Sequence, residues 1–98
     1  MAEYWLLDSA EVDLNEIADY TIENFGIEQA RVYKDGLTRA FQLLAENPLI
    51  GSDQGHIRSN VRRFVHKSHA IYYRLDGDDV LVLRILGPGQ DPLHQLLE

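Results

Sequence analysis

The sequence contains no cysteine, so a disulfide framework, a thiolate nucleophile and a metal–sulfur site are all excluded. No apolar run approaches the roughly 20 residues that a membrane-spanning helix needs. The start of the chain has no basic segment followed by an apolar stretch, so we expect no secretory signal peptide. Together these absences predict a cytoplasmic protein with no membrane partner.

Positive charge is also scarce. Nine Lys and Arg residues stand against sixteen Asp and Glu residues, which gives a net charge of −7. Nucleic-acid binders normally carry a basic surface, because neutralised phosphates supply much of their affinity. The available cations gather in one region, at Arg58, Arg62, Arg63 and Lys67. We therefore expect a protein partner at this basic cluster rather than direct contact with nucleic acid.

What remains is the composition of an ordinary globular protein, with 45% apolar and 26% charged residues. A chain of 98 residues is long enough for one hydrophobic core and too short for two. We expect residues 1–98 to form a single domain.

Apolar residues recur at helical spacing in two consecutive segments. The first has Asp8 or Ser9 as its expected N-cap, and Gly26 ends it. The second ends at Asn47-Pro48, since a residue before proline avoids helical geometry. The acidic residues of the first segment are expected to face solvent. The apolar stripes predict an antiparallel helical hairpin and consist of Leu14, Ile17, Ala18, Thr21, Ile22 and Phe25, then Ala30, Tyr33, Leu37, Ala40, Phe41 and Leu44.

Short runs of β-branched, aromatic and aliphatic residues predict four strands, one near residues 3–7 and three within residues 62–86. Asp76-Gly77 supplies the tight turn between the last two. Residues 48–60 are rich in Pro, Gly, Ser, Asp and Asn and predict a loop, and the residues after Pro92 predict a short helical turn or a frayed tail. Helices followed by strands, without βαβ alternation, indicate an α+β domain.

We therefore expect an N-terminal strand, the helical hairpin and a three-stranded antiparallel meander, with both helices on one face of the sheet. The opposite face would be partly open, as a binding surface is. Alternation along the last strand separates Leu81, Leu83 and Ile85 from a second set. We expect the first set to meet the helices. The open face is then expected to carry Val80, Val82, Arg84, Arg62 and Tyr72.

Several spaced motifs resemble the ParE toxins, within the RelE/ParE superfamily of bacterial toxin–antitoxin systems. They cover about 80 residues in the family's order and read Ala10-x-x-Asp13-Leu14-x-x-Ile17-x-x-Tyr20, Phe25-Gly26-x-x-x-Ala30-x-x-Tyr33-x-x-x-Leu37, Leu44-Ala45-x-x-Pro48-x-x-Gly51, Ile57-Arg58, Arg62-x-Phe64, Ser68-His69-x-Ile71-x-Tyr73-Arg74 and Arg84-Ile85-Leu86. One position departs from the pattern: Gly87 stands where the family commonly has a histidine after the Arg-Ile-Leu triplet. A role that depends on that histidine is therefore in doubt.

The resemblance implies a growth-inhibiting toxin that serves in plasmid stabilisation. Such a toxin poisons DNA gyrase and is neutralised by a ParD-like antitoxin. We expect a gyrase inhibitor without enzymatic activity of its own, and no cofactor. The antitoxin is expected to use the basic cluster and the open face, at Arg58, Arg62, Arg63, Lys67, Tyr72, Val80, Val82 and Arg84. Nucleic acid would be contacted only through the antitoxin.

Two alternatives stay open. The first is a RelE-like endonuclease that cuts mRNA on the ribosome, for which Arg62, Arg84 and His66 are the available cations and base. The second is an inactive relative that acts only as a co-repressor with its antitoxin. A metal site is not expected, because His66 and His69 flank a turn and too few further ligands are placed beside them.

Overall fold

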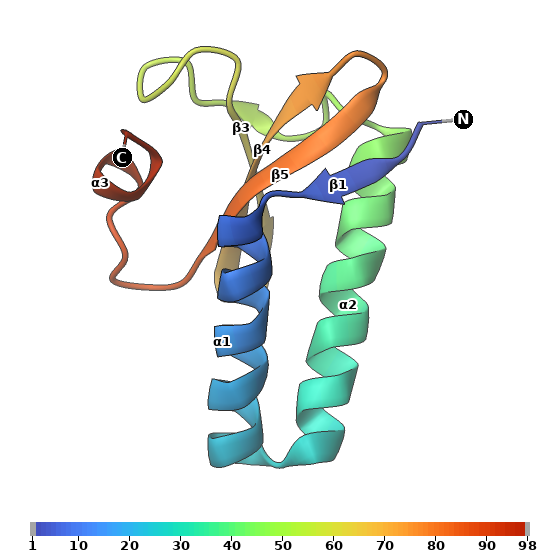
Figure 1. Ribbon diagram of the computed structural model, residues 1–98, viewed down its shortest axis with the longest axis vertical. Helices are drawn as coiled ribbons and strands as arrows, with labels where there is room; N and C mark the ends of the chain where they lie inside the picture. Colours follow the sequence, from blue (N-terminus) through green and yellow to red (C-terminus); the bar gives the residue numbers. More distant parts are fainter. Residues whose placement is uncertain (1, 98) are drawn as a thin grey trace.

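The computed structural model describes residues 2–97, which form a five-stranded sheet with two long helices on one face. The elements are β1 Tyr4–Leu6, α1 Asp8–Phe25, α2 Ile27–Glu46, β2 Ser52–Asp53, β3 Arg62–His66, β4 His69–Asp76, β5 Asp79–Leu86 and α3 Pro92–Leu97. The strand order is β1-β5-β4-β3-β2, with β1 parallel to β5 and the other neighbours antiparallel (Figure 1). The α+β class is confirmed; the fifth strand is the two-residue β2, inside the expected loop.

The main core lies between the helical hairpin and the sheet. Ala10 of α1 and Leu37, Phe41 and Leu44 of α2 pack against inward residues of β4 and β5. Both helices therefore cover the same face, as the two apolar stripes predict. Gly26 ends α1 with a positive φ of 90°, which a residue without a Cβ adopts at little cost.

The orientation expected for β5 is wrong. Val80 and Val82 are fully buried against the helices, whereas Leu81 and Leu83 lie on the opposite face. Ile85 does face the helices, because a β-bulge breaks the alternation. Tyr72 pairs with Arg84 and Tyr73 with Val82, so Leu83 is the extra residue on β5. Strict alternation along this strand could not place all of its residues correctly.

The first turns of α1 close the edge of β5 beyond the point where β1 ends. The Ser9 hydroxyl donates to the Leu83 carbonyl at 3.0 Å, and Asp13 Oδ2 accepts the Ile85 N–H at 2.9 Å. Two expectations are corrected here. Leu7 occupies the N-cap position without a side-chain cap, and Asp13 is buried rather than solvated. A helix beside an unpaired strand edge must satisfy that edge, so these polar side chains turn inward.

A second, smaller core covers part of the face that was expected to be open. Leu96 of α3 packs with Val61, Tyr72 and Leu83, and all four are buried. Arg58 Nη1 donates to the Leu96 carbonyl at 3.3 Å and so ties the 54–60 loop to α3. The short helix and this loop cover part of the face, and the surface of β3 and β4 beside them stays accessible. None of the helices within residues 2–97 is long and apolar enough to cross a membrane.

Candidate functional site: a cation-lined groove on the sheet

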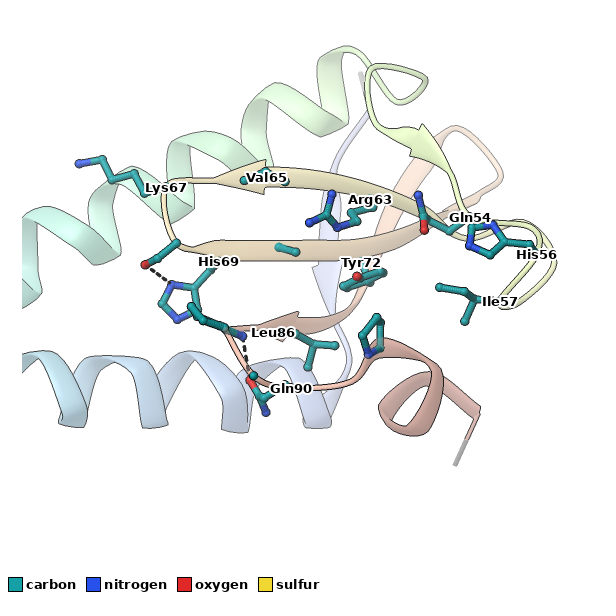
Figure 2. Close-up of a pocket in the computed structure, with 16 residues that line it drawn as sticks. Gln54, His56, Ile57, Arg63, Val65, Lys67, His69, Tyr72, Leu86 and Gln90 are labelled. Carbon is teal, nitrogen blue, oxygen red and sulfur yellow. Dashed lines mark hydrogen bonds between the residues drawn. The ribbon is translucent and has the colours of Figure 1, made fainter.

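The accessible part of this face is a groove of about 590 Å³, which we call the sheet-face groove (Figure 2). Its floor consists of outward residues of β3 and β4, among them Arg63, Val65 and Tyr72. The loop at Gln54–Ile57 forms one wall, and the segment from Leu86 to Pro92 forms the other. The groove is therefore built by three segments that the sheet topology brings together.

Each wall is fixed by its own hydrogen bonds. Gln54 N–H donates to the Val61 carbonyl at 2.8 Å, which folds the loop back onto the start of β3. On the other side, the Gly87 N–H donates to Gln90 Oε1 at 2.8 Å, drawn as a dashed line in Figure 2. The groove is thus a formed feature of the fold.

The charge of the groove is opposite to that of the protein. Arg63 and Lys67 line it, and none of its described lining residues is an Asp or Glu, although the chain holds sixteen such residues. The floor also carries apolar surface, since Val65 is 50% exposed and Tyr72 is the cross-strand partner of Arg63. An acidic segment with apolar side chains is the ligand that such a surface complements.

His69 lies at the end of the groove, where β4 begins. Its Nδ1 is 2.5 Å from the Tyr33 hydroxyl of α2, and Ser68 Oγ lies 3.5 Å away. Burial, and secondarily the nearby His66, lowers the pKa of His69 from its ordinary value. The imidazole is therefore neutral near pH 7 and can accept the Tyr33 hydroxyl proton in a hydrogen bond.

His66 lies on the helix side of β3 and does not reach the groove. Its ring meets Tyr33 edge to face, and a Cβ at Gly36 would lie 3.0 Å from its Nε2. Burial, then Lys67 and Arg39, lowers the pKa of His66. The glycine within α2, a local cost in a helix, therefore makes room for this ring.

The structure separates the arginines that the sequence grouped together. Arg62 lies on the helix side of β3 and donates to the Gly51 carbonyl at 2.6 Å. Arg84 Nε and Nη2 donate to Asp13 at 2.7 and 2.9 Å, and its Nη1 donates to Gln95 at 2.9 Å. The expectation that Arg62 lines the open face is wrong, because carbonyl oxygens of the 49–51 loop hold it on the helix side. Arg84 is the cross-strand partner of Tyr72, but Asp13 and Gln95 engage its guanidinium.

Among the other residues expected to bind the antitoxin, some are buried in the core and some line the groove. Val80 and Val82 are buried under the helices and present no surface to a partner. Tyr72 lines the groove but is 3% exposed. Arg63 and Lys67 are the expected cations among its lining residues, and the Lys67 Nζ lies 6.0 Å from the centroid of the Tyr33 ring of α2. Sequence reasoning missed His69, Gln54 and Gln90, which the fold brings to the groove from distant segments.

The residues of the nuclease alternative do not form one constellation. Arg62 and His66 are on the same face of β3 but four residues apart, which is about 13 Å along a strand. Arg84 is neutralised by Asp13. Within residues 2–97, no group of three or more His, Asp or Glu residues is placed to hold a metal ion.

Comparison with known proteins gives one consistent result. A family model described as "ParE toxin of type II toxin-antitoxin system, parDE" matches residues 4–92. The chain is 34% identical over 86 residues to toxin ParE1 of Caulobacter vibrioides, covering 88% of each chain. It is 34% identical over 91 residues to toxin ParE1 of Mycobacterium tuberculosis H37Rv, covering 92% of this chain and 93% of that one.

A solved structure described as "Chromosomal ParDE TA system from P. aeruginosa" has the same fold. The TM-score is 0.75 over 89% of this chain and 95% of that chain, with 20% sequence identity.

Proposed function

This chain belongs to the ParE toxin family of type II toxin–antitoxin systems, and from that premise we propose that it arrests bacterial growth by poisoning DNA gyrase until a ParD-like antitoxin neutralises it. The toxin acts by binding, without a catalytic reaction of its own. Family membership supports the toxin role. The scattered positions of Arg62, His66 and Arg84 favour binding over RNA cleavage.

The antitoxin docks in the sheet-face groove. The observation that carries this assignment is the absence of carboxylates among the described lining residues of a strongly acidic protein. Arg63 and Lys67 orient an acidic antitoxin segment, and Val65 provides apolar contact area beside them. Such a segment is disordered before binding and orders on the toxin surface.

Arg58 and Arg62 support the groove without lining it. Arg58 holds the loop wall against α3 through the Leu96 carbonyl, and Arg62 holds the 49–51 loop. They therefore shape the groove, whereas Arg63 and Lys67 supply its charge.

The docking assignment is tested by binding kinetics with the antitoxin encoded beside the toxin gene. Arg63→Glu and Lys67→Glu should each lower the association rate roughly tenfold at low salt and reduce its dependence on salt. Lys34→Glu is the matched control, because Lys34 is exposed on α2 and does not line the groove. Val65→Asp should instead accelerate dissociation. Unchanged kinetics in all three groove variants would contradict the assignment.

The target is tested by expressing the chain alone in bacteria and assaying gyrase with the purified protein. Growth arrest with DNA damage and loss of supercoiling supports gyrase poisoning. Cleavage of mRNA at ribosomes, with gyrase unaffected, would instead support the endonuclease alternative. A folded chain that causes no arrest would identify a co-repressor.

A further inference from the structure

The helical hairpin extends beyond the sheet that it covers. In Figure 1 the lower ends of α1 and α2, with the connection between them, project past the strands. The apolar stripe of α1 continues along this projecting part, although no strand lies beneath it. A stripe that faces the core near Ala10 therefore becomes exposed near Phe25.

The uncovered stripe forms one wall of a cleft of about 460 Å³, which we call the hairpin cleft. Tyr20 and Phe25 line it from α1, Tyr33 lines it from α2, and the Lys67–His69 turn closes its far side. Tyr20 is 63% exposed and Phe25 is 67% exposed. Two aromatic rings this accessible in one cleft of a small protein mark a surface that a partner covers.

The α1 side of the cleft is negative, whereas Lys67 is the one cation among its described lining residues, with its Nζ 6.0 Å from the centroid of the Tyr33 ring. α1 carries six carboxylates and no Lys or Arg, namely Asp8, Glu11, Asp13, Glu16, Asp19 and Glu23. Glu16 and Glu23 lie four residues before and three residues after Tyr20, so all three share one face of the helix. Arg84 compensates Asp13, whereas Glu16 and Glu23 are exposed on the same helix, and Glu16 lines the cleft that adjoins this one.

A smaller adjoining cleft of about 260 Å³ continues the surface towards β5. It shares Tyr20 and His69 with the hairpin cleft and adds Glu16 and Ile17. The combined surface follows α1 over several turns, which is the length that a helical segment of a partner would need.

We propose that the hairpin cleft binds the protein target of the toxin, through a segment that places an apolar anchor between Lys or Arg side chains. This inference rests on the proposed function in taking the chain to act on a protein. The anchor contacts Tyr20 and Phe25, and its basic neighbours face Glu16 and Glu23. Carboxylates at this rim repel nucleic acid. They also repel a second copy of the chain, since each copy would bring the same acidic helix.

The surface is distinct from the sheet-face groove. The two surfaces share only the Lys67–His69 turn among their described lining residues, and Tyr20, Phe25 and Glu23 do not line the groove. The toxin therefore presents acidic and cationic surfaces on either side of one turn, for two partners of opposite charge.

The test uses the full chain with Phe25→Asp, and separately with Glu16→Lys and Glu23→Lys combined. Val12→Asp is the control for the first variant, since Val12 is 54% exposed on α1 outside the cleft. Asp35→Lys, at an exposed position of α2, controls for charge reversal. Thermal unfolding and antitoxin binding are measured for every variant, alongside growth arrest and gyrase inhibition.

We expect both cleft variants to stay folded and to bind the antitoxin normally. Their inhibitory concentration should rise roughly 30-fold, the loss typical of removing one buried aromatic anchor, with a matching loss of growth arrest. Both controls should remain inhibitory.

Three results would overturn the inference. The first is full growth arrest by a folded Phe25→Asp variant. The second is a parallel loss of antitoxin binding, which would assign the cleft to the antitoxin. The third is a dimer of the unsubstituted chain that Phe25→Asp dissociates. Growth arrest that depends on Phe25 while gyrase stays active would refute gyrase as the target and leave the cleft assignment supported, so the two failures are distinguishable.

Discussion

Asp13 of α1 and Arg84 of β5 lie 71 residues apart in the chain and form a two-bond ion pair, with N–O distances of 2.7 and 2.9 Å. The same carboxylate accepts the Ile85 N–H, so one side chain neutralises a cation and satisfies a strand edge. Side-chain hydrogen bonding to Asp13 is the main cause that raises the pKa of Arg84 further above its ordinary value.

Loss of the Asp13 carboxylate should therefore be costly. Asp13→Ala leaves Arg84 partly buried without its partner, and we expect the free energy of unfolding to fall by about 3–5 kcal/mol. Asp13→Asn should cost less, because the amide oxygen still accepts the Ile85 N–H. Asp19→Ala, at an exposed position of the same helix, is the control and should change stability by less than about 0.5 kcal/mol. Urea denaturation measures all three, and equal losses for Asp13→Ala and Asp19→Ala would contradict the role of the pair.

Gly51 is packed against Tyr73 so closely that a side chain does not fit. A Cβ there would lie 2.5 Å from the Tyr73 hydroxyl oxygen and 2.9 Å from the Arg63 carbonyl oxygen. We expect Gly51→Ala to lower the free energy of unfolding by about 1–3 kcal/mol through overpacking. Leu49→Ala serves as the control in the same loop, since Leu49 is 65% exposed. A thermal midpoint for Gly51→Ala equal to that of the control would show that the loop adjusts freely.

The two central histidines predict how stability depends on pH. Burial lowers the folded-state pKa of both His66 and His69 below the ordinary histidine value of 6.5. Well above pH 6.5 both histidines are neutral in the folded chain and in the unfolded chain. Their contribution to stability is then fully present. As the pH falls through 6.5, the unfolded chain binds protons that the folded chain does not, so the free energy of unfolding decreases.

His69→Gln tests this dependence, because its amide oxygen can accept the Tyr33 hydroxyl hydrogen bond without titrating. The free energy of unfolding of this variant should change less between pH 7.5 and pH 5 than that of the unsubstituted chain, by roughly the contribution of one histidine. His56→Gln is the control, since His56 is exposed on the loop wall. Identical pH profiles for His69→Gln and the unsubstituted chain would refute the assignment.

A valine-to-aspartate substitution should affect stability very differently on the two faces of the sheet. Val82→Asp places a carboxylate in the core between helices and sheet, and we expect a loss of at least about 4 kcal/mol, which unfolds a marginally stable domain. Val65→Asp, on the groove side of β3, should remain folded with a change of less than about 0.5 kcal/mol. Far-UV circular dichroism distinguishes them, and a folded Val82→Asp protein would contradict the orientation of β5.

The helical hairpin and the order of the elements along the chain follow from local sequence signals. The stripe of α2 is confirmed at Leu37, Phe41 and Leu44, and Asn47 caps the end of that helix. These features depend on residues a few positions apart, where periodicity and turn chemistry decide the structure. The family resemblance then supplied the topology that periodicity alone could not.

What the sequence did not reveal depends on contacts between distant residues. The bulge at Leu83 lets both Val82 and Ile85 face the helices, and no pattern within the strand marks it. Asp13 is buried because α1 happens to pass the free edge of β5. Phe25 is exposed because the sheet ends before the helix does. Each outcome depends on where a second element lies in space.

The parallel pairing of β1 with β5 has a consequence for how the chain folds. β5 is the last strand to be synthesised, yet it lies between β1 and β4 and contributes Val80, Val82 and Ile85 to the core. Until it is in place, β1 has no neighbour and α1 has no sheet edge to close. Contacts between residues more than 70 positions apart form slowly. The entropy cost of closing the chain between them comes before the contacts stabilise the fold. Completion of the fold, and with it the assembly of both proposed docking surfaces, therefore awaits this one late strand.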